Sequence, residues 1–556
     1  MRLMRMSLSP RLWIPAMLAA FFVLHLPILA TGTRAHPDEQ YYTDAAIRMV
    51  QTGDYVTPTF ADGSMRFNKP ILTYWAVVAG FRLFGIGIFA SRILFLIAGC
   101  LIPWIGYLTA RVLFRDRRAA FAAAVMLIAN DELRAASLRA NPDILLCLGF
   151  ALAFLGFARI LFGGSRAARD FVLGYGGVGL AVASKGLLGV ALLAYLVPAA
   201  TLLRRRGFAL RSLLHWPAML LGLAVAGFWF LLALRAHGPT ALQGFFTDQV
   251  GSRFVMSHGE RLGHVASYLA GPLAGLLPWS AIALLAAWPA RAALGRFWNG
   301  HRAESLFALG WCALLIVVFS VGNMTRPRYL LPAFPLLAAW LGAVLATVSR
   351  EPAARRVLRA AARVALAGGL LLGLFCLWAG FRLDPRLALF AAGWIAALLG
   401  LLFWSLRRGD AARCAALGAL TLYLLWGYDA ALRPILGSDP APALAARLDS
   451  RDLGGREVVA VGVPPRYLSR IRVLSGGRVL PRDLGGSLPQ PLPPHAVAIV
   501  DGGRSAEFTA AGYRLEPCGH SYRRVRFGEL WEAARRGDMS ALRAEKIRPY
   551  FLALPE

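Results

Sequence analysis

The chain has 556 residues, of which 58% are hydrophobic, and a formal net charge of +30 at pH 7. This content leaves room for about a dozen membrane helices of roughly 20 residues each, together with a modest soluble domain. The positive charge does not indicate a nucleic-acid-binding protein, because the arginines recur in short clusters between apolar blocks and do not form one patch. The composition therefore predicts a polytopic membrane protein without a nucleic-acid partner.

The first apolar segment runs to Ala30 and follows a short basic stretch from Met1 to Arg11. A secretory signal peptide has this order of charge and hydrophobicity, but small residues in an A-x-A-like pattern mark its cleavage site. That pattern does not follow here, and many similar apolar segments come later in the chain. We therefore expect an uncleaved first membrane span.

A polar stretch from His36 to Trp75 comes next, between two hydrophobic blocks, and it must face water at a membrane surface. Its residues 38–50 have the apolar spacing of a helix. This places Asp38 and Glu39 in the first helical turn, where the helix dipole stabilises negative charge. The two carboxylates are either an N-terminal pair on a surface helix or catalytic groups, and the spacing leaves both interpretations open.

Four short motifs in this stretch carry a resemblance to a known family. They are Asp38-Glu39 with Tyr42, Gly53-Asp54-Tyr55, Phe67 with Lys69-Pro70, and Tyr74-Trp75. In this order they resemble the first outer loop of bacterial aminoarabinose (4-amino-4-deoxy-L-arabinose) lipid A transferases. Those enzymes are part of the wider family of membrane glycosyltransferases with the protein O-mannosyltransferase (GT-C) fold, which use polyprenyl-phosphate sugars. The resemblance covers roughly residues 10–430 and implies that Asp38, with Glu39, is catalytic.

Clusters of arginine recur between the apolar segments and indicate the membrane topology. If about thirteen transmembrane helices are drawn, all of these clusters lie in the cytoplasm, as the positive-inside rule favours. The segments left outside are residues 32–87, 131–143, 183–186, 237–267, 322–329, 382–386 and everything after about 431. We therefore predict a polytopic α-helical membrane protein whose transmembrane catalytic domain, residues 1–430, carries an outward-facing site.

The donor phosphate is expected to bind cations from these outer segments. Lysine occurs at three positions in a chain otherwise rich in arginine, and Lys69 is the one in the motif, which suggests a need for a compact ammonium. Chance and a snorkelling interfacial lysine are the alternatives. The resemblance implies that Arg253, followed by Phe254, contacts the lipid phosphate, with Arg261 as the fallback. A guanidinium suits a phosphate because it can bind in a bidentate manner.

Further candidates follow from the same resemblance. Tyr329, in a Tyr-x-x-Pro stretch, is implied as a hydrogen-bond donor to the phosphate, although a tyrosine of the interfacial aromatic belt is an equal alternative. Asp143 resembles the second outer carboxylate of the family, and its alternative role is at the start of an apolar helix. The remaining candidates for substrate binding are Tyr42, Arg66, Lys185, Arg261 and Arg326.

A bound metal is not expected, and no cofactor is certain. No histidine or cysteine spacing resembles a closed zinc site. The residue before the motif lysine is often acidic in the family, whereas here it is Asn68, and Asp248 stands where relatives tend to carry histidine. A divalent metal is therefore a weaker alternative.

The composition changes after about residue 431, and residues 431–556 are predicted to form an outward-facing α/β domain. Helices are expected over 441–448 and 528–546, and short strands over 457–463, 471–474, 495–500, 513–515 and 522–527. No catalytic constellation is visible in this part of the sequence. We expect a module that supports the site or gathers substrate.

Together these features predict an inverting glycosyltransferase in the bacterial inner membrane, with its active site and C-terminal domain in the periplasm. It would move 4-amino-4-deoxy-L-arabinose from undecaprenyl phosphate to a phosphate of lipid A. Another sugar, such as galacturonate or mannose, or a protein or polysaccharide hydroxyl acceptor, is an alternative. A non-enzymatic lipid-sugar transporter would keep the donor-binding cations without needing Asp38, but it would be expected to place charges along a mid-membrane pathway.

Overall fold

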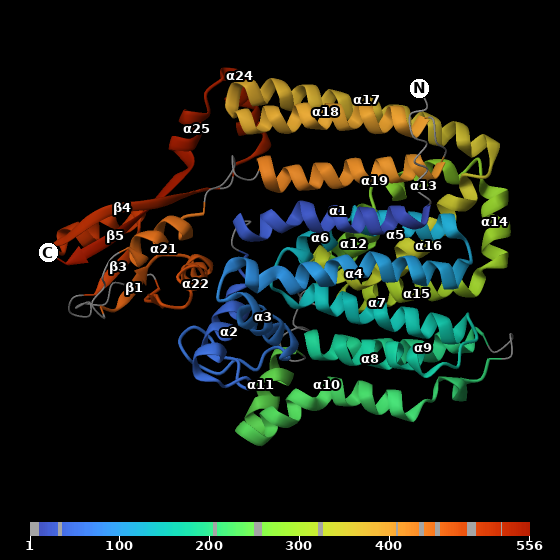
Figure 1. Ribbon diagram of the computed structural model, residues 1–556, viewed down its shortest axis with the longest axis horizontal. Coiled ribbons are helices and arrows are strands. Elements are labelled where there is room, and N and C mark those ends of the chain that lie inside the picture. Colours follow the sequence, from blue (N-terminus) through green and yellow to red (C-terminus); the bar gives the residue numbers. More distant parts are fainter. Residues whose placement is uncertain are drawn as a thin grey trace, which may run out of the picture.

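The computed structural model describes residues 10–31, 36–203, 208–249, 258–320, 326–406, 410–432, 439–450, 456–485, 496–523 and 525–555. Within these ranges the first four-fifths of the chain forms a bundle of long, roughly aligned helices (Figure 1). A smaller part with a β-sheet lies at one end of the bundle, next to two short helices from the N-terminal third of the chain (Figure 1).

Helices make up almost all of the first four-fifths of the chain within the described residues. In chain order they are α1 (Pro10–Thr31), α2 (Gln40–Thr52), α3 (Leu72–Phe84), α4 (Ile88–Phe114), α5 (Arg117–Ile128), α6 (Asp131–Ser137), α7 (Pro142–Leu161), α8 (Ala168–Lys185), α9 (Leu188–Thr201), η2 (Leu210–Leu213), α10 (Trp216–His237), α11 (Pro239–Gln249), α12 (His258–Gly275), α13 (Trp279–Ala287), α14 (Arg291–Gly300), α15 (Arg302–Ser320), η4 (Pro327–Ala333), α16 (Phe334–Val348), α17 (Pro352–Leu383), α18 (Pro385–Leu406), α19 (Asp410–Gly427) and η5 (Tyr428–Leu432).

The apolar helices confirm a multi-pass membrane protein. Among the described residues, six helices are long and apolar enough to cross a membrane, or seven if the bent pair α12 and α13 counts as one span. Shorter apolar helices, such as α3 and α9, occur between these spans along the chain. The total of about thirteen spans stays a prediction.

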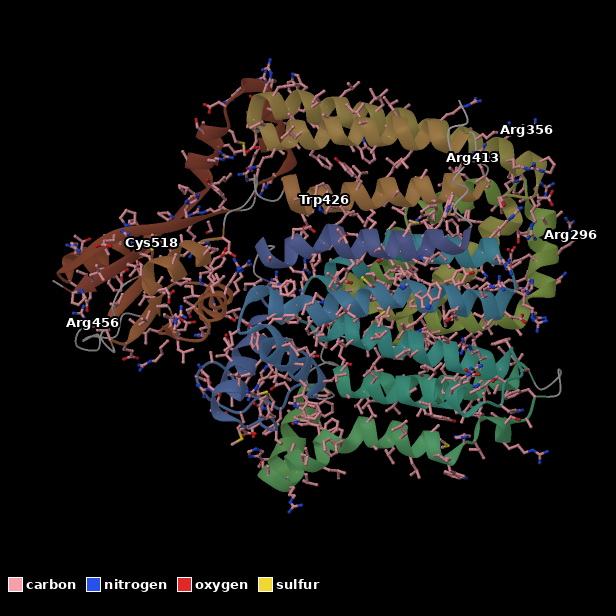
Figure 2. The ribbon with its side chains drawn as sticks, viewed as in Figure 1. Arg296, Arg356, Arg413, Trp426, Arg456 and Cys518 are labelled. Atoms are coloured by element: carbon pink, nitrogen blue, oxygen red, sulfur yellow. The ribbon has the colours of Figure 1, made fainter. Side chains whose placement is uncertain are left out.

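Arginines mark the end of the bundle that lies away from the sheet. Arg296, Arg356 and Arg413 lie at that end, whereas Arg456 and Cys518 lie in the sheet-containing part (Figure 2). These three arginines belong to clusters that the sequence predicts on the cytoplasmic side, and their common end of the bundle agrees with that prediction.

Glycines allow α7 and α8 to pack closely. A Cβ atom added at Gly149 would lie 2.7 Å from the backbone nitrogen of Ala181, and one added at Gly156 would lie 2.4 Å from the carbonyl oxygen of Asp170. Small residues let the backbones of membrane helices touch in this way. Since the chain reverses between the two helices, the start of α7 and the end of α8 lie together.

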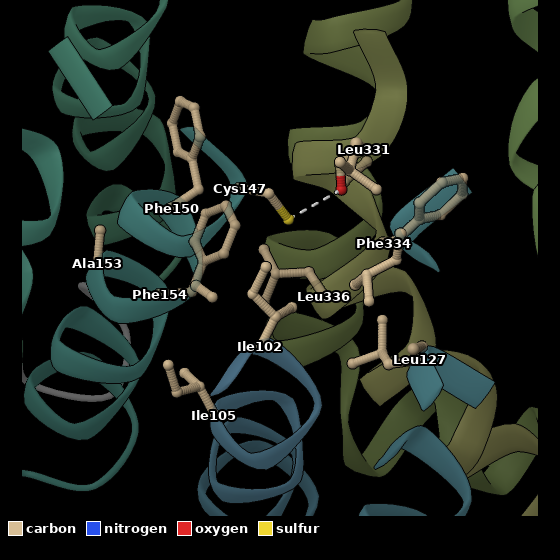
Figure 3. Close-up of a cluster of buried hydrophobic side chains, with 14 of the residues drawn as sticks. Ile102, Ile105, Leu127, Cys147, Phe150, Ala153, Phe154, Leu331, Phe334 and Leu336 are labelled. Carbon is tan, nitrogen blue, oxygen red and sulfur yellow. Dashed lines mark hydrogen bonds between the residues drawn. The ribbon is translucent and has the colours of Figure 1, made fainter. Parts of the chain in front are cut away.

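The core of the bundle joins α4, α7 and the η4–α16 segment. Phe150 and Phe154 of α7 and Leu331 of η4 are fully buried in it (Figure 3). The thiol of Cys147 donates to the carbonyl oxygen of Leu331, with 3.5 Å between sulfur and oxygen (Figure 3). This packing fixes the start of α7 against η4, and both segments carry charged residues at that end of the bundle.

The C-terminal part is an α/β unit with its own buried clusters. Its elements are α21 (Ala441–Asp449), β1 (Val458–Val461), α22 (Pro465–Leu474), β2 (Arg482–Asp483), β3 (Val497–Asp501), η6 (Gly502–Arg504), α23 (Ser505–Ala510), β4 (Tyr513–Tyr522), α24 (Phe527–Arg536), α25 (Met539–Lys546) and β5 (Ile547–Pro555). The sheet has the order β2-β1-β3-β5-β4. Strands β1, β2 and β3 are parallel, and β5 is antiparallel to β3 and β4.

Several predicted elements of this part differ from the structure. Residues 471–474, predicted as a strand, complete α22, in which Leu468 and Ile471 are both fully buried at helical spacing. The predicted helix over 528–546 is two helices, because Gly537 ends α24 in a left-handed conformation with φ of 73°. Strand β5 was not predicted.

Candidate active site

The helix that follows the motif carboxylates begins at Gln40, two residues later than predicted. Residues before it form a turn in which the backbone nitrogen of Glu39 donates to the carbonyl oxygen of His36. This turn sends the side chains of Asp38 and Glu39 to different partners. The two neighbouring carboxylates therefore have different environments and different chemistry.

Glu39 is buried, with 7% of the residue exposed. Its carboxylate accepts from Arg92 Nε at 2.8 Å and Arg92 Nη2 at 2.6 Å, and from the backbone nitrogen of Ala140 at 2.9 Å. Burial raises the pKa of Glu39, but the charge of Arg92 outweighs it, and the pKa is lowered to about 2. These contacts tie the start of α2 to α4 and to the turn before α7.

Asp38 joins a charged cluster built from three other segments. Its Oδ2 accepts from Arg328 Nη2 of η4 at 2.5 Å, and Arg328 Nε lies 3.2 Å from Asp143 Oδ2 at the start of α7. The ammonium of Lys185, at the end of α8, donates to the other oxygen of Asp143. Lys185 Nζ also lies 4.3 Å from the centre of the Tyr329 ring. We call these five residues the Asp38–Lys185 cluster.

Asp38 is the most accessible charged group of this cluster. Its side chain is 38% exposed, compared with 17% for Arg328, 11% for Lys185 and 5% for Asp143. Burial raises the pKa of Asp38, but the charge of Arg328 and its hydrogen bond outweigh this effect, so the pKa lies below its usual value of 3.8. Asp38 is therefore ionised at neutral pH and can face a ligand.

The sequence places Asp143 at the start of α7 for a local reason. The side chain of Asn141 accepts from the backbone nitrogen of Asp143, and Pro142 occupies the first turn, as at many helix starts. The prediction that Asp143 lies near a helix start is thus confirmed. The contacts with Lys185 and Arg328 come in addition, so this carboxylate also belongs to the cluster.

Arg66 and Tyr42, both candidates for substrate binding, are buried in the first outer loop. The guanidinium carbon of Arg66 lies 4.6 Å from the centre of the Tyr41 ring and 5.4 Å from that of Phe60. Arg66 also donates to the hydroxyl of Tyr74, whose ring lies 5.0 Å from that of Tyr42. This packing holds the loop to α2 and α3. Substrate contact by Arg66 or Tyr42 stays a prediction that the geometry does not favour.

The remaining predicted donor-binding residues are less closely defined. Lys69 is half-buried in the turn before α3, two residues after Phe67, which packs on the ring of His237 at the end of α10. Arg326 is exposed just before η4. Arg253 lies outside the described residues, as do the side chains of Arg261 and Asp248. Their roles stay predictions.

Two residues of the site were not singled out from the sequence. Arg328, which contacts both Asp38 and Asp143, lies between the predicted residues Arg326 and Tyr329, but sequence alone does not tell which of the two arginines faces the carboxylates. His36 Nε2 lies 3.3 Å from Arg328 Nη1. Burial first, and then the charge of Arg139, lower the pKa of His36 to about 4, so it is neutral at pH 7.

A metal site is a separate question. Within the described ranges, no three His, Cys, Asp or Glu side chains are grouped so that they could hold a metal ion. Asn68, in the turn before Lys69, is a neutral residue and lacks the charge that would draw a divalent cation. The need for a metal stays a prediction to be tested with the protein itself.

Known proteins resemble this chain in sequence and in fold. The family described as dolichyl-phosphate-mannose-protein mannosyltransferase matches residues 68–230. An undecaprenyl phosphate-alpha-4-amino-4-deoxy-L-arabinose arabinosyl transferase of Pseudomonas aeruginosa is 31% identical over 337 residues, which cover 59% of this chain and 59% of the relative. The arabinosyl transferase 2 of Pseudomonas fluorescens is 28% identical over 343 residues, 60% of this chain and 56% of the relative. The chain thus spans less than two thirds of the length of these curated relatives.

Solved structures cover nearly the whole chain. The crystal structure of ArnT from Cupriavidus metallidurans bound to undecaprenyl phosphate has a TM-score of 0.70 and 20% identity, and covers 98% of both chains. Its apo form has a TM-score of 0.69 and 19% identity over the same shares. The predicted resemblance is confirmed: the chain is similar in sequence to aminoarabinosyl transferases and has the membrane glycosyltransferase fold of a solved one.

Proposed function

We propose that this chain, a relative of the aminoarabinosyl transferases, moves 4-amino-4-deoxy-L-arabinose from undecaprenyl phosphate to a phosphate of lipid A. The observation that carries the proposal is the Asp38–Lys185 cluster, in which an accessible carboxylate is held by an arginine that also contacts a buried Asp143–Lys185 pair. The relatives of known name act on the same lipid-linked donor. The cluster belongs to the same end of the bundle as the first outer loop.

The chemical demand on the donor side is to stabilise a lipid phosphate as it leaves. Its developing negative charge requires cations or hydrogen-bond donors that are already in position in a partly desolvated site. Lys69 and Arg253 are the proposed cations, and the hydroxyl of Tyr329 is the proposed hydrogen-bond donor. Lys185 over the ring of Tyr329 adds positive charge beside that hydroxyl.

The acceptor side is assigned to Asp38. A carboxylate with a lowered pKa is a weak general base, because the efficiency of proton abstraction rises with the pKa of the base. An acceptor that is already anionic needs little deprotonation, whereas a protein hydroxyl needs more. The low pKa of Asp38 therefore supports a phosphate acceptor, with Asp38 and Asp143 orienting the substrates or holding the amino group of the sugar. Attack from the acceptor would then invert the anomeric carbon, because no residue is assigned as a nucleophile toward the sugar.

We also infer a division of the chain and its orientation. Residues 1–430 would form the catalytic membrane domain and residues 431–556 a periplasmic domain of the bacterial inner membrane. Arg296, Arg356 and Arg413, at the end of the bundle away from the sheet, support this orientation, since the positive-inside rule puts such residues in the cytoplasm (Figure 2).

Mass spectrometry of lipid A tests the proposal. We expect cells that express the protein, in a host supplied with undecaprenyl-phosphate aminoarabinose, to gain lipid A heavier by one aminoarabinose. Asp38→Asn should abolish this gain. Asp62→Asn is the matched control, because Asp62 is an exposed carboxylate of the same loop whose oxygen accepts from Ser64, as an amide oxygen also can. Unmodified lipid A with properly inserted wild-type protein would refute the proposed acceptor or sugar.

A further inference from the structure

The helix that begins next to Asp38 also packs on the C-terminal domain. Three polar contacts run along α2 and join it to α22 and the turn after it. They are Thr43 Oγ1 with Ser469 Oγ at 2.9 Å, Asp44 Oδ2 with Arg472 Nη1 at 2.8 Å, and Gln51 Nε2 with the carbonyl oxygen of Gly477 at 3.0 Å. The contacts therefore span α2 from its first turn to its last.

The ion pair in this interface is buried. The side chains of Asp44 and Arg472 are each 8% exposed, and Arg472 also donates to the carbonyl oxygen of Pro481 within its own domain. A buried ion pair adds little net stability, because desolvation offsets its attraction, but a misaligned one is costly. Such a pair fixes the rotation and the register of one helix against another.

The interface leads to the active-site carboxylate in few steps. Thr43, which contacts Ser469, also donates to the carbonyl oxygen of Glu39 through both its hydroxyl and its backbone nitrogen, each at 3.0 Å. Glu39 directly follows Asp38, whose carboxylate meets Arg328. The C-terminal domain thus contacts the first turn of α2, which directly follows the turn that carries Asp38.

The turn after α22 approaches α2 closely at Gly477. A Cβ atom added at Gly477 would lie 3.1 Å from Gln51 Nε2 and 3.2 Å from Ile47 Cγ2. Gly477 also has a φ of 78°, which side chains rarely adopt. The turn after α22 therefore contacts α2 at a position where a side chain would not fit.

We propose that Arg472 and Ser469 are positioning residues, through which the C-terminal domain holds α2 so that Asp38 faces Arg328. This inference rests on the proposed function and gives the C-terminal domain a defined part in it. Neither residue touches the Asp38–Lys185 cluster, so both act through the helix.

Steady-state kinetics of sugar transfer by the purified full-length protein provide the first test. Arg472→Gln should lower kcat at least tenfold and change the KM for the donor less than twofold, because it disturbs Asp38 and leaves the donor phosphate site intact. The neutral pair Asp44→Asn with Arg472→Gln should recover most of the loss, since amide partners can restore the contact. Arg478→Gln, which removes an exposed ion pair with Asp449 in the same domain, is the matched control and should keep the wild-type kcat.

Hydrogen exchange supplies a readout that does not depend on the sugar. Arg472→Gln should speed amide exchange in residues 40–44 and leave the exchange of α4 unchanged. An unchanged kcat, or a lowered kcat with unchanged exchange in α2, would overturn the inference. A wild-type protein that transfers no aminoarabinose would instead refute the proposed function, while the exchange experiment would still test the positioning.

A reversible tether covers the case in which Arg472→Gln fails to fold. Thr43→Cys with Ser469→Cys places two thiols where the hydroxyl oxygens lie 2.9 Å apart, and formation of the disulfide is checked by mass spectrometry before the assay. When this cysteine pair is combined with Arg472→Lys, oxidation should raise kcat and reduction should lower it again. A kcat that is indifferent to oxidation, with the disulfide formed, would overturn the inference.

Discussion

Replacing Glu39 by glutamine separates a structural carboxylate from a catalytic one. Glu39 is the partner of Arg92, a residue that is 2% exposed in α4. The glutamine keeps the shape of the side chain but leaves the guanidinium without its counter-charge. Breaking a buried pair by removing one partner typically costs about 3–5 kcal/mol.

The lowered pKa of Glu39 gives a second route to the size of this loss. A lowering from 4.5 to about 2 corresponds to about 3 kcal/mol of stability, at about 1.4 kcal/mol for each pH unit. Because the pKa is depressed in the folded state, this stability is present above pH 4.5 and is lost as the pH falls from 4.5 toward 2. The two routes agree, so we expect Glu39→Gln to be destabilised by about 3 kcal/mol at pH 7.

Unfolding of the purified protein, followed between pH 7 and pH 3, is the assay. The stability difference between Glu39→Gln and wild type should shrink as the pH falls, because the wild-type carboxylate becomes protonated. Glu132→Gln is the matched control: burial raises the pKa of Glu132, so its ionised form disfavours folding and its removal should not destabilise. Full stability of Glu39→Gln with loss of sugar transfer would refute this reasoning and make Glu39 catalytic.

The other predictions concern the reaction itself. Asp38→Asn and Lys69→Ala should each abolish sugar transfer, while membrane insertion and size-exclusion profiles stay those of the wild type; a transfer rate within threefold of the wild type would contradict the assigned role. Arg328→Lys keeps the charge but cannot span both carboxylates, so transfer should fall about tenfold or more, the effect of losing a charged hydrogen bond worth about 1.5–3 kcal/mol. Arg253→Ala should weaken the binding of undecaprenyl phosphate, measured by titration, more than Arg261→Ala does, and equal effects would remove the assignment of Arg253.

The sequence predicts most residues of the charged cluster but not which of them contact one another. Asp38, Asp143, Lys185 and Tyr329 were expected on one side of the membrane, and the structure brings them together. Their common side follows from topology, which arginine clusters and apolar lengths determine. The contact of Arg328 with both carboxylates depends on the backbone path of η4. Without that path, the sequence does not tell whether Arg326 or Arg328 contacts them.

The roles of the two motif carboxylates could not be separated from the sequence either. Asp38 and Glu39 are neighbours with the same charge, and helical spacing treats them alike. Their difference comes from Arg92, more than fifty positions later, and from the backbone nitrogen of Ala140. Contacts at such separations are tertiary and leave no local pattern.

In the C-terminal sheet, too, an element that depends on tertiary contacts was not predicted from the sequence. Strand β1 was predicted because a short run of buried apolar residues carries its own signal. Strand β5 contains two prolines and directly follows α25, so neither its composition nor its flanks mark it as a strand. It is held by pairing with β3 and β4 on both sides.

The glycine contacts between α7 and α8 lie along the same two helices whose ends carry the buried Asp143–Lys185 pair. Because the two backbones touch at Gly149 and Gly156, the helices are expected to tilt as one body when lipids of another chain length change the thickness of the membrane. The distance between the carboxylate and the ammonium then stays the same while the depth of the pair changes. We therefore expect growth temperature, which alters lipid composition, to affect substrate access more than the geometry of these charges.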